Sequence, residues 1–212
     1  MIEMELDSFE SIKTGAANFL SRSSTLNVLT CTAGVMACPE GMTKDGFETQ
    51  FGVNYLGHFL LFQLLRNALK SSSSPSFASR VVTLSSCAHR GGGVRFSDYN
   101  FKKEPYNAGT AYSQAKTADI YLATEIERRY GRDGIHGLPI HPGFIRTPLV
   151  RHVEKVPEGK QFIENPEALH IWKSPEQGAA TTVWAAVGKE WEGRGGRYLE
   201  DSQWHCNLRH PS

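Results

Sequence analysis

Apolar positions recur along this chain with two different spacings, and the two alternate. Spacings of three and four residues predict helices over residues 9–20, 47–69, 111–130 and 175–187. Short apolar runs between them predict strands over residues 26–29, 80–84, 137–140 and 196–199. Strands that alternate with helices are typical of a parallel sheet covered on both faces. We therefore expect an α/β fold, a doubly wound parallel sheet in one domain over residues 1–212.

Local signals fit the ends of several of these elements. Ser8 is suited to cap the start of the first helix, and Gly131 to end the third. Pro175 stands at a first-turn position of the last helix, where proline is tolerated. Pro139 is less expected, because it lies inside a predicted strand and removes one donor from the ladder.

Length and charge narrow the class of protein. At 212 residues the chain is long enough for one domain with a substantial core. Its net charge of +1, with both signs mixed, leaves no electrostatic footprint for nucleic acid or an anionic membrane. Apolar runs such as Phe59–Phe62 are too short to cross a bilayer, and the first residues do not resemble a signal peptide. These features favour a cytoplasmic enzyme or binding protein.

Cysteine and histidine spacings indicate neither a disulfide framework nor a metal site. The cysteines form no CxxC pair, and in a chain without a secretion signal we expect reduced thiols at Cys31, Cys38, Cys87 and Cys206. The later histidines show no HxxxH or HxH spacing, so no metal site is expected at His141, His152, His170, His205 or His210.

Small and polar residues directly follow three of the predicted strands. These are Thr32-Ala33-Gly34, Ser85-Ser86 and Pro142-Gly143. In parallel sheets of this kind, ligands bind outside the carboxyl ends of the strands. The sequence therefore predicts that these three segments meet at one rim of the sheet.

Tyr112 and Lys116 stand one turn apart on a predicted helix, and this pair has a chemical logic. A phenol has a pKa of about 10 and is a poor base at neutral pH. A lysine four residues later lies on the same face, and its charge favours the phenolate. Tyr112 would then exchange a proton with a substrate oxygen while a hydride moves to or from a nicotinamide cofactor.

Two further polar residues extend this constellation. A hydroxyl at Ser86 could hydrogen-bond the same substrate oxygen and stabilise developing charge. Asn54 is a polar residue on an otherwise apolar helix, so it needs a hydrogen-bond partner if it is buried. A water-linked relay to Lys116 is one such partner. Tyr-x-x-x-Lys alone would be an ordinary pair on a helix surface, so the order of the whole set carries the interpretation.

In this order, these residues resemble the short-chain dehydrogenase/reductase family. The resemblance is closest to the branch that holds retinol dehydrogenases, WW-domain oxidoreductases and many fungal secondary-metabolism reductases. It rests on Met4–Asp7, Thr32–Met36, Gly52–Phe59, Arg80–Ser86, Tyr112–Lys116 and Pro142–Thr147.

The resemblance implies a role for each matching residue. It implies that Tyr112 is the catalytic acid and base, that Lys116 activates it and binds ribose, and that Ser86 polarises the carbonyl. Asn54 completes the tetrad. The positions that it places at the cofactor are Asp7, Cys31, Ala33, Gly34, Tyr112, Lys116, Ile145 and Thr147. The cofactor is NADP or NAD, and the resemblance favours NADP.

The chain departs from the family before the first predicted helix. The family opens with a strand, a Thr-Gly-x-x-x-Gly-x-Gly turn that holds pyrophosphate, and a helix. No such turn is present here, and Thr14-Gly15 lies inside a predicted helix. We therefore expect a Rossmann-like sheet that is truncated at the N-terminus and lacks the βαβαβ phosphate-binding part. Its loss would leave a hydrophobic edge at residues 26–29.

Two hypotheses of function follow. The first is an NAD(P)-dependent oxidoreductase that interconverts a ketone or aldehyde with an alcohol on a small apolar metabolite, in secondary metabolism by resemblance. Residues 150–173 would cap the substrate, and a homodimer would form through helices 47–69 and 111–130. The second is a truncated, non-catalytic relative that serves as an interaction module. A true start upstream of Met1 would also explain the missing turn.

Overall fold

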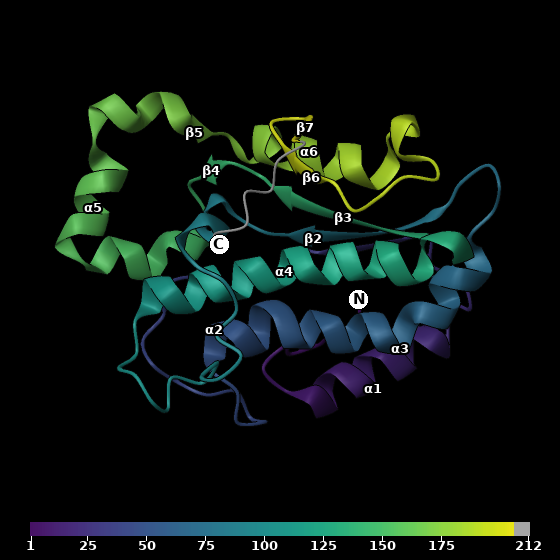
Figure 1. Cartoon of the computed structure of the whole chain (residues 1–212), viewed down its shortest axis with the longest axis horizontal. Helices are drawn as coiled ribbons and strands as arrows, with labels where there is room; N and C mark the ends of the chain where they lie inside the picture. The colour runs from purple at the N-terminus through teal and green to yellow at the C-terminus, as the bar shows by residue number, and fades with distance from the viewer. Residues whose placement is uncertain (206–212) are drawn as a thin grey trace.

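The computed structural model describes residues 1–205, and these form three layers (Figure 1). The sheet lies between α6 (Pro175–Val187) on one side and α1 (Phe9–Leu20), α3 (Gly57–Ser72) and α4 (Ala108–Tyr130) on the other. The predicted α/β fold with a Rossmann-like sheet is confirmed.

The strands follow the order β1-β2-β3-β6-β7 across the sheet. They are β1 (Val28–Cys31), β2 (Ser79–Leu84), β3 (Ile135–His141), β6 (Tyr198–Glu200) and β7 (Gln203–His205). The first four are parallel, whereas β7 turns back antiparallel to β6. The carboxyl ends of β1, β2 and β3 therefore point to the same rim, as predicted.

The core lies on both faces of the sheet, because successive side chains of a strand point to opposite sides. Val81 packs with Phe62, Leu122 and Ile126 on the side of α3 and α4. The next residue along β2 faces α6, in a cluster of Val82, Leu138, Ile140, Ala185, Trp191 and Leu199. Burial on both faces explains why these strands are continuous apolar runs in the sequence.

The edge of the sheet at β1 is less apolar than predicted. Within residues 1–205, β1 is an edge strand and pairs with β2 alone. Leu26 and Leu29 are half-buried and pack against the core, while Thr30 is exposed. The strand also begins at Val28 rather than at residue 26.

The prediction of one continuous helix over residues 47–69 is wrong at its start. The segment begins with a single turn, α2 (Thr49–Phe51), continues as a π-helical turn over Gly52–Leu56, and only then becomes α3. A π-helical turn accommodates an extra residue, and such turns are frequent at functional sites. Asn54 lies in the middle of this one.

Gly131 and Pro139, which the sequence marks at a helix end and inside a strand, lie in more detailed surroundings than predicted. Gly131 does cap α4, but the left-handed residue is Gly134, with φ of 79°, after a short 3-10 turn. Pro139 is buried within β3, and its missing donor is tolerated because β3 pairs with β6 only at Ile140 and His141.

The chain after β3 leaves the sheet and overhangs its carboxyl rim, at the left of Figure 1. It runs through β4 (Phe144–Ile145), a 3-10 helix (Pro148–Lys155), α5 (Pro157–Glu164), a second 3-10 helix (Pro166–Ile171) and β5 (Trp172–Lys173). The segment predicted to cap a substrate, residues 150–173, falls within this overhang.

The cysteines and the longest helices bear on the expected environment of the chain. Cys31, Cys38 and Cys87 are free thiols, whereas Cys206 lies outside the described residues. Among residues 1–205, the longest apolar helices are still too short or too polar to cross a lipid bilayer.

Candidate active site

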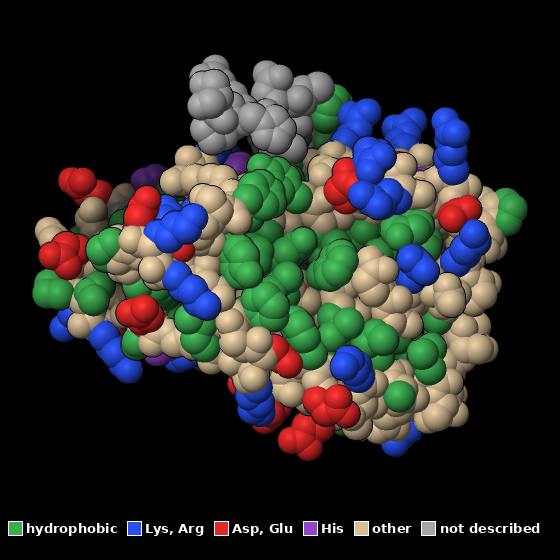
Figure 2. Space-filling model, turned by 60° about the horizontal axis from the view of Figure 1, so that its bottom comes forward, with side chains coloured by type: hydrophobic (Ala, Val, Ile, Leu, Met, Phe, Trp, Pro, Cys, Tyr) green, Lys and Arg blue, Asp and Glu red, His purple; other side chains and the backbone are tan. Residues whose placement is uncertain are grey.

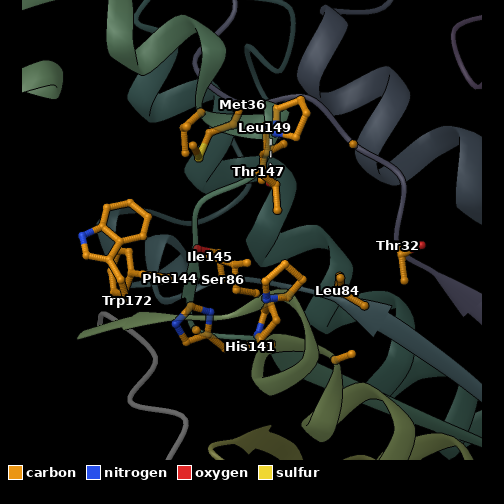
Figure 3. Close-up of a pocket in the computed structure, with 18 of the residues that line it drawn as sticks. Thr32, Met36, Leu84, Ser86, His141, Phe144, Ile145, Thr147, Leu149 and Trp172 are labelled. Carbon is orange, nitrogen blue, oxygen red and sulfur yellow. Dashed lines mark hydrogen bonds between the residues drawn. The ribbon is translucent and has the colours of Figure 1, made fainter. Parts of the chain in front are cut away.

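A cavity of about 710 Å³ opens at the carboxyl ends of β1, β2 and β3. The three segments predicted to meet at this rim all contribute to its wall, through Gly34, Ser86 and Pro142. Tyr112 lines it from α4, and Ile145 and Thr147 line it from the overhang. Figure 3 shows Ser86, Ile145 and Thr147 around this space.

Tyr112 and Lys116 are placed by α4, which is the most buried helix along this part of the sheet. Asn107 caps its start by accepting a hydrogen bond from the Thr110 backbone N–H at 2.8 Å. Every residue from Ala111 to Ile120 is buried, so this part of α4 does not lie on the surface. The ordinary interpretation of Tyr-x-x-x-Lys as an exposed pair therefore does not apply.

Lys116 lies beside Tyr112 with its ammonium engaged by two oxygen atoms. Nζ donates to the Leu84 carbonyl at 2.7 Å and to Asp119 Oδ2 at 2.9 Å. The same nitrogen stands 5.7 Å from the centroid of the Tyr112 ring. The predicted proximity of the tyrosine and lysine is thus present, and the lysine is already held by a buried carboxylate.

Lys116 lowers the pKa of Tyr112, as expected, but the net shift of that pKa is upward. Burial raises the pKa of Tyr112 above its ordinary value, and this effect outweighs the opposing charge of Lys116 and the hydrogen-bonding Ser86 hydroxyl. Asp119 and Cys87 add to the rise. The sequence shows the lysine charge, but only the fold shows how deeply the phenol is buried.

Ser86 lies two residues after the end of β2 and begins the next turn. It caps a 3-10 helix (Cys87–Gly91), and its Oγ accepts a hydrogen bond from the Ala88 backbone N–H at 3.1 Å. The Ser86 hydroxyl itself lies 4.0 Å from Cys87 Sγ and also interacts with the Tyr112 phenol, so a ligand oxygen would take over this donor. Ser85, by contrast, is buried and donates to the Lys116 carbonyl at 2.7 Å.

Asn54 is fully buried, and its partners are in the loop after β1. Oδ1 accepts from the Val35 N–H at 2.8 Å, and Nδ2 donates to the Val35 carbonyl at 2.9 Å. The Asn54 side chain therefore holds this loop, while its own carbonyl contacts His58 Nδ1 at 2.7 Å. A Cβ at Gly34 would come 2.9 Å from Asn54 Oδ1, which explains the glycine there.

The residues predicted to contact a cofactor divide into two groups. Gly34, Tyr112, Ile145 and Thr147 line the cavity, and Lys116 lies beside Tyr112. Three others are not part of the described wall. The Cys31 side chain points into the core, the Asp7 carboxylate lies 3.7 Å from Lys44 Nζ, and Ala33 is exposed. Cofactor contacts of all these residues stay predictions.

An aromatic wall closes the cavity on the side of the overhang. The ring centroids of Phe144, Phe162 and Trp172 are 5.9–6.1 Å apart, and the His141 ring packs edge-on against Phe144 at 5.9 Å. Figure 3 shows Phe144 and Trp172 side by side near His141. Phe162 and Trp172 both belong to residues 150–173, the segment predicted to cap a substrate.

Sequence reasoning also missed Asp119, the carboxylate that binds Lys116. The signal that could have revealed it is its spacing, because an acid three residues after a lysine shares a helix face with it. For metal ions, no three side chains among His, Cys, Asp and Glu are grouped as ligands within the described part of the chain. The side chain of His205 and all of His210 fall outside that description.

The cavity fits the nicotinamide end of a dinucleotide. It extends from the loop after β1, where Gly34 brings the backbone against Asn54, to Tyr112 and Thr147. Lys116 has three N–H donors, of which two are bound to protein oxygens. Gly34, Tyr112, Ile145 and Thr147 would border the nicotinamide and its ribose.

Comparison with known proteins places this geometry in a family. A family model described as enoyl-(acyl carrier protein) reductase matches residues 1–189. The short-chain dehydrogenase/reductase prx1 of Penicillium roqueforti is 52% identical over 204 residues, which cover 96% of this chain and 59% of that protein. Human retinol dehydrogenase 13 is 38% identical, and the match covers 93% of this chain and 59% of the relative.

Solved structures share the fold. The 3-alpha-hydroxysteroid dehydrogenase from Pseudomonas sp. B-0831, complexed with NADH, aligns with a TM-score of 0.75 at 21% identity, over 93% of this chain and 80% of that one. The chain spans about 59% of the length of the two curated relatives named above. Given the family-model match over residues 1–189 and these relatives, the chain belongs to the short-chain dehydrogenase/reductase family.

Proposed function

We propose that this protein is an NAD(P)-dependent oxidoreductase that interconverts an alcohol with a ketone or aldehyde on a small apolar metabolite. One observation carries the proposal. Ser86 and Tyr112 line one apolar cavity, and the Lys116 ammonium lies 5.7 Å from the Tyr112 ring. A hydroxyl donor and a phenol that line one space, with a buried cation beside the phenol, are the groups that a carbonyl oxygen needs for proton exchange.

In this proposal Tyr112 moves the proton. Its phenol donates a proton to the substrate oxygen in the reductive direction and takes one back in the oxidative direction. Ser86 would donate a hydrogen bond to the same oxygen in place of its long contact with Cys87 Sγ at 4.0 Å. The bound nicotinamide, NADP or NAD, supplies or accepts the hydride. The family resemblance favours NADP.

Lys116 would act on Tyr112 directly, and Asn54 would act through the loop after β1. The positive charge of Lys116 favours the phenolate, and its third N–H would reach a ribose hydroxyl. Asn54 fixes the loop after β1 through both atoms of its amide, so it would set the position of the cofactor through Gly34 and Val35. Asp7, Cys31 and Ala33 would contact the cofactor outside the cavity itself.

The substrate in this proposal is apolar and carries a ring. The wall is mostly apolar, and Phe144, Phe162 and Trp172 offer ring faces and edges for stacking. Residues 150–173 would cap the bound substrate, since Val150, Val153 and Ile163 of this segment also line the cavity. A reductive step in secondary metabolism, in the cytoplasm, is the setting that the resemblance suggests.

A substrate screen tests the proposed reaction. The purified chain is incubated with NADPH or NADH and a panel of aryl ketones and aldehydes, and loss of reduced cofactor is followed by absorbance. Turnover of at least one ring-bearing carbonyl compound, lost in Tyr112→Phe, is the expected result. Equal turnover by the Tyr112→Phe variant would exclude the mechanism.

We also propose that two copies associate through α3 and α4. Figure 2 turns the side of the molecule that carries α1, α3 and α4 toward the viewer and shows apolar side chains gathered there. Phe59 of α3 is 38% exposed and packs on the half-buried Tyr55 at 6.1 Å. Burial of such a patch against its own copy is the simplest way to remove it from water.

A further inference from the structure

Lys116 and Asp119 form an ion pair inside the protein. Nζ and Oδ2 are 2.9 Å apart, and the two side chains are 8% and 3% exposed. They lie three residues apart on α4, so they share one helix face. A buried charge is costly without a partner, and each of these two groups is the partner of the other.

The backbone at both residues is fastened to β2. The Ser85 hydroxyl donates to the Lys116 carbonyl at 2.7 Å, and the Thr83 hydroxyl donates to the Asp119 carbonyl at 2.9 Å. Nζ itself donates to the Leu84 carbonyl at 2.7 Å. Thr83 and Leu84 of β2 and the following Ser85 therefore fix this turn of α4, and the ammonium has little freedom to move toward another position.

The pair also changes what Tyr112 experiences. Lys116 alone would favour the phenolate, but the carboxylate of Asp119 acts in the opposite sense on the same phenol. Together the two groups have no net charge. We propose that Asp119 is a positioning residue, which holds the Lys116 ammonium between its carboxylate and the Leu84 carbonyl and opposes its effect on Tyr112. Its importance for catalysis rests on the proposed function, whereas the ion pair itself does not.

Other titratable groups face this pair from the neighbouring elements. They are Cys31 of β1, Tyr55 and His58 of the π-helical turn and α3, and Cys87 after β2. Burial raises the pKa of Cys31 and of Tyr55, and it lowers the pKa of His58 to about 4. Those three groups are therefore neutral near pH 7, which makes Asp119 the anion that balances Lys116.

The test is a titration of Tyr112 that needs neither substrate nor cofactor. The chain is labelled with ¹³C at the tyrosine Cζ, and Tyr112→Phe identifies the resonance. In Asp119→Asn we expect Tyr112 to titrate at a pH about one to two units lower than in the unaltered chain. Glu125→Gln is the matched control, because it removes one negative charge from the exposed part of the same helix and should leave Tyr112 unchanged.

The outcomes separate this inference from the proposed function. A Tyr112 titration that does not move in Asp119→Asn, or that moves as far in Glu125→Gln, would overturn the role of Asp119 even if the enzyme is active. A shift confined to Asp119→Asn would support it even if no substrate is turned over.

A second measurement decides the matter if Asp119→Asn does not fold. Burial raises the pKa of Asp119 to about 6 against the opposing charge of Lys116. In the unaltered chain labelled at the aspartate carboxyl, lysine Cε and tyrosine Cζ carbons, the Asp119, Lys116 and Tyr112 resonances should change together near that pH. Absence of a common change would overturn the proposal.

Discussion

Phe144 of β4 and Trp172 of β5 face one another in a two-residue parallel ladder, with their ring centroids 6.1 Å apart and their planes at 71°. Almost thirty residues of chain separate them, and the ladder closes that segment over the cavity. Gly143 permits the turn that leads into β4, since its φ of 93° disfavours other residues. The aromatic wall is thus a product of backbone pairing rather than of a local motif.

The aromatic wall leads to a prediction about substrate affinity. Trp172→Ala should raise KM for ring-bearing carbonyl compounds by roughly tenfold or more, since one side of the apolar site is lost. The turnover number should change less, because Ser86 and Tyr112 are untouched. Steady-state kinetics would measure both constants. Trp204→Ala is the matched control, because Trp204 is 47% exposed and outside the cavity wall, and its KM should equal that of the unaltered chain.

Removal of the Tyr112 hydroxyl should abolish proton exchange with little change in fold. We expect Tyr112→Phe to lower the turnover number by about 10²- to 10⁴-fold, the usual contribution of a positioned acid or base. Tyr121→Phe, two turns further along α4, should retain full activity. Equal losses in both variants would point to a general effect on the helix and contradict a special role for Tyr112.

His58 should make stability depend on pH. Burial lowers its pKa from 6.5 to about 4, so the unfolded chain binds more protons than the folded one between these values. Stability from this residue is therefore lost as the pH falls from 6.5 toward 4, by roughly 3 kcal/mol in all. The His58→Gln variant has no such histidine to protonate. The difference in free energy of unfolding between the unaltered chain and this variant should therefore be smaller at pH 4.5 than at pH 7.

Urea unfolding at the two pH values measures this difference directly. The comparison with the variant is needed because the raised pKa of Asp119 has the opposite effect on stability between about pH 4 and pH 6. Asp119 is present in both chains, so its contribution cancels in the difference. A free-energy difference between His58→Gln and the unaltered chain that is the same at both pH values would contradict the lowered pKa of His58.

The apolar face of α3 leads to a prediction about assembly. If two copies associate through α3 as proposed, the unaltered chain should have the mass of a dimer in light scattering after gel filtration and Phe59→Glu the mass of a monomer, because a charge in that apolar patch cannot be buried unpaired. Phe96→Glu places the same charge at a side chain that is 78% exposed and should leave the mass unchanged. A mass that is the same for Phe59→Glu and the unaltered chain would exclude this interface.

The fold and the central part of the site could be predicted because their determinants are local. Helical periodicity gave α4 and put Tyr112 one turn from Lys116, and strand ends gave the rim with Ser86. Three features depend instead on tertiary structure. The π-helical turn at Asn54 interrupts a pattern that looks continuous, the ladder of Phe144 and Trp172 joins distant residues, and burial reverses the expected direction of the Tyr112 pKa.

The most direct measurement is binding of the nicotinamide nucleotide itself. The 212-residue chain is titrated with NADPH and NADH while energy transfer from its tryptophans to the reduced ring is recorded, since Trp172 lines the cavity. We predict saturable transfer with NADPH, and weaker binding in Lys116→Met, which loses a donor to the ribose. A folded chain that shows no transfer with either nucleotide would contradict the proposed oxidoreductase function.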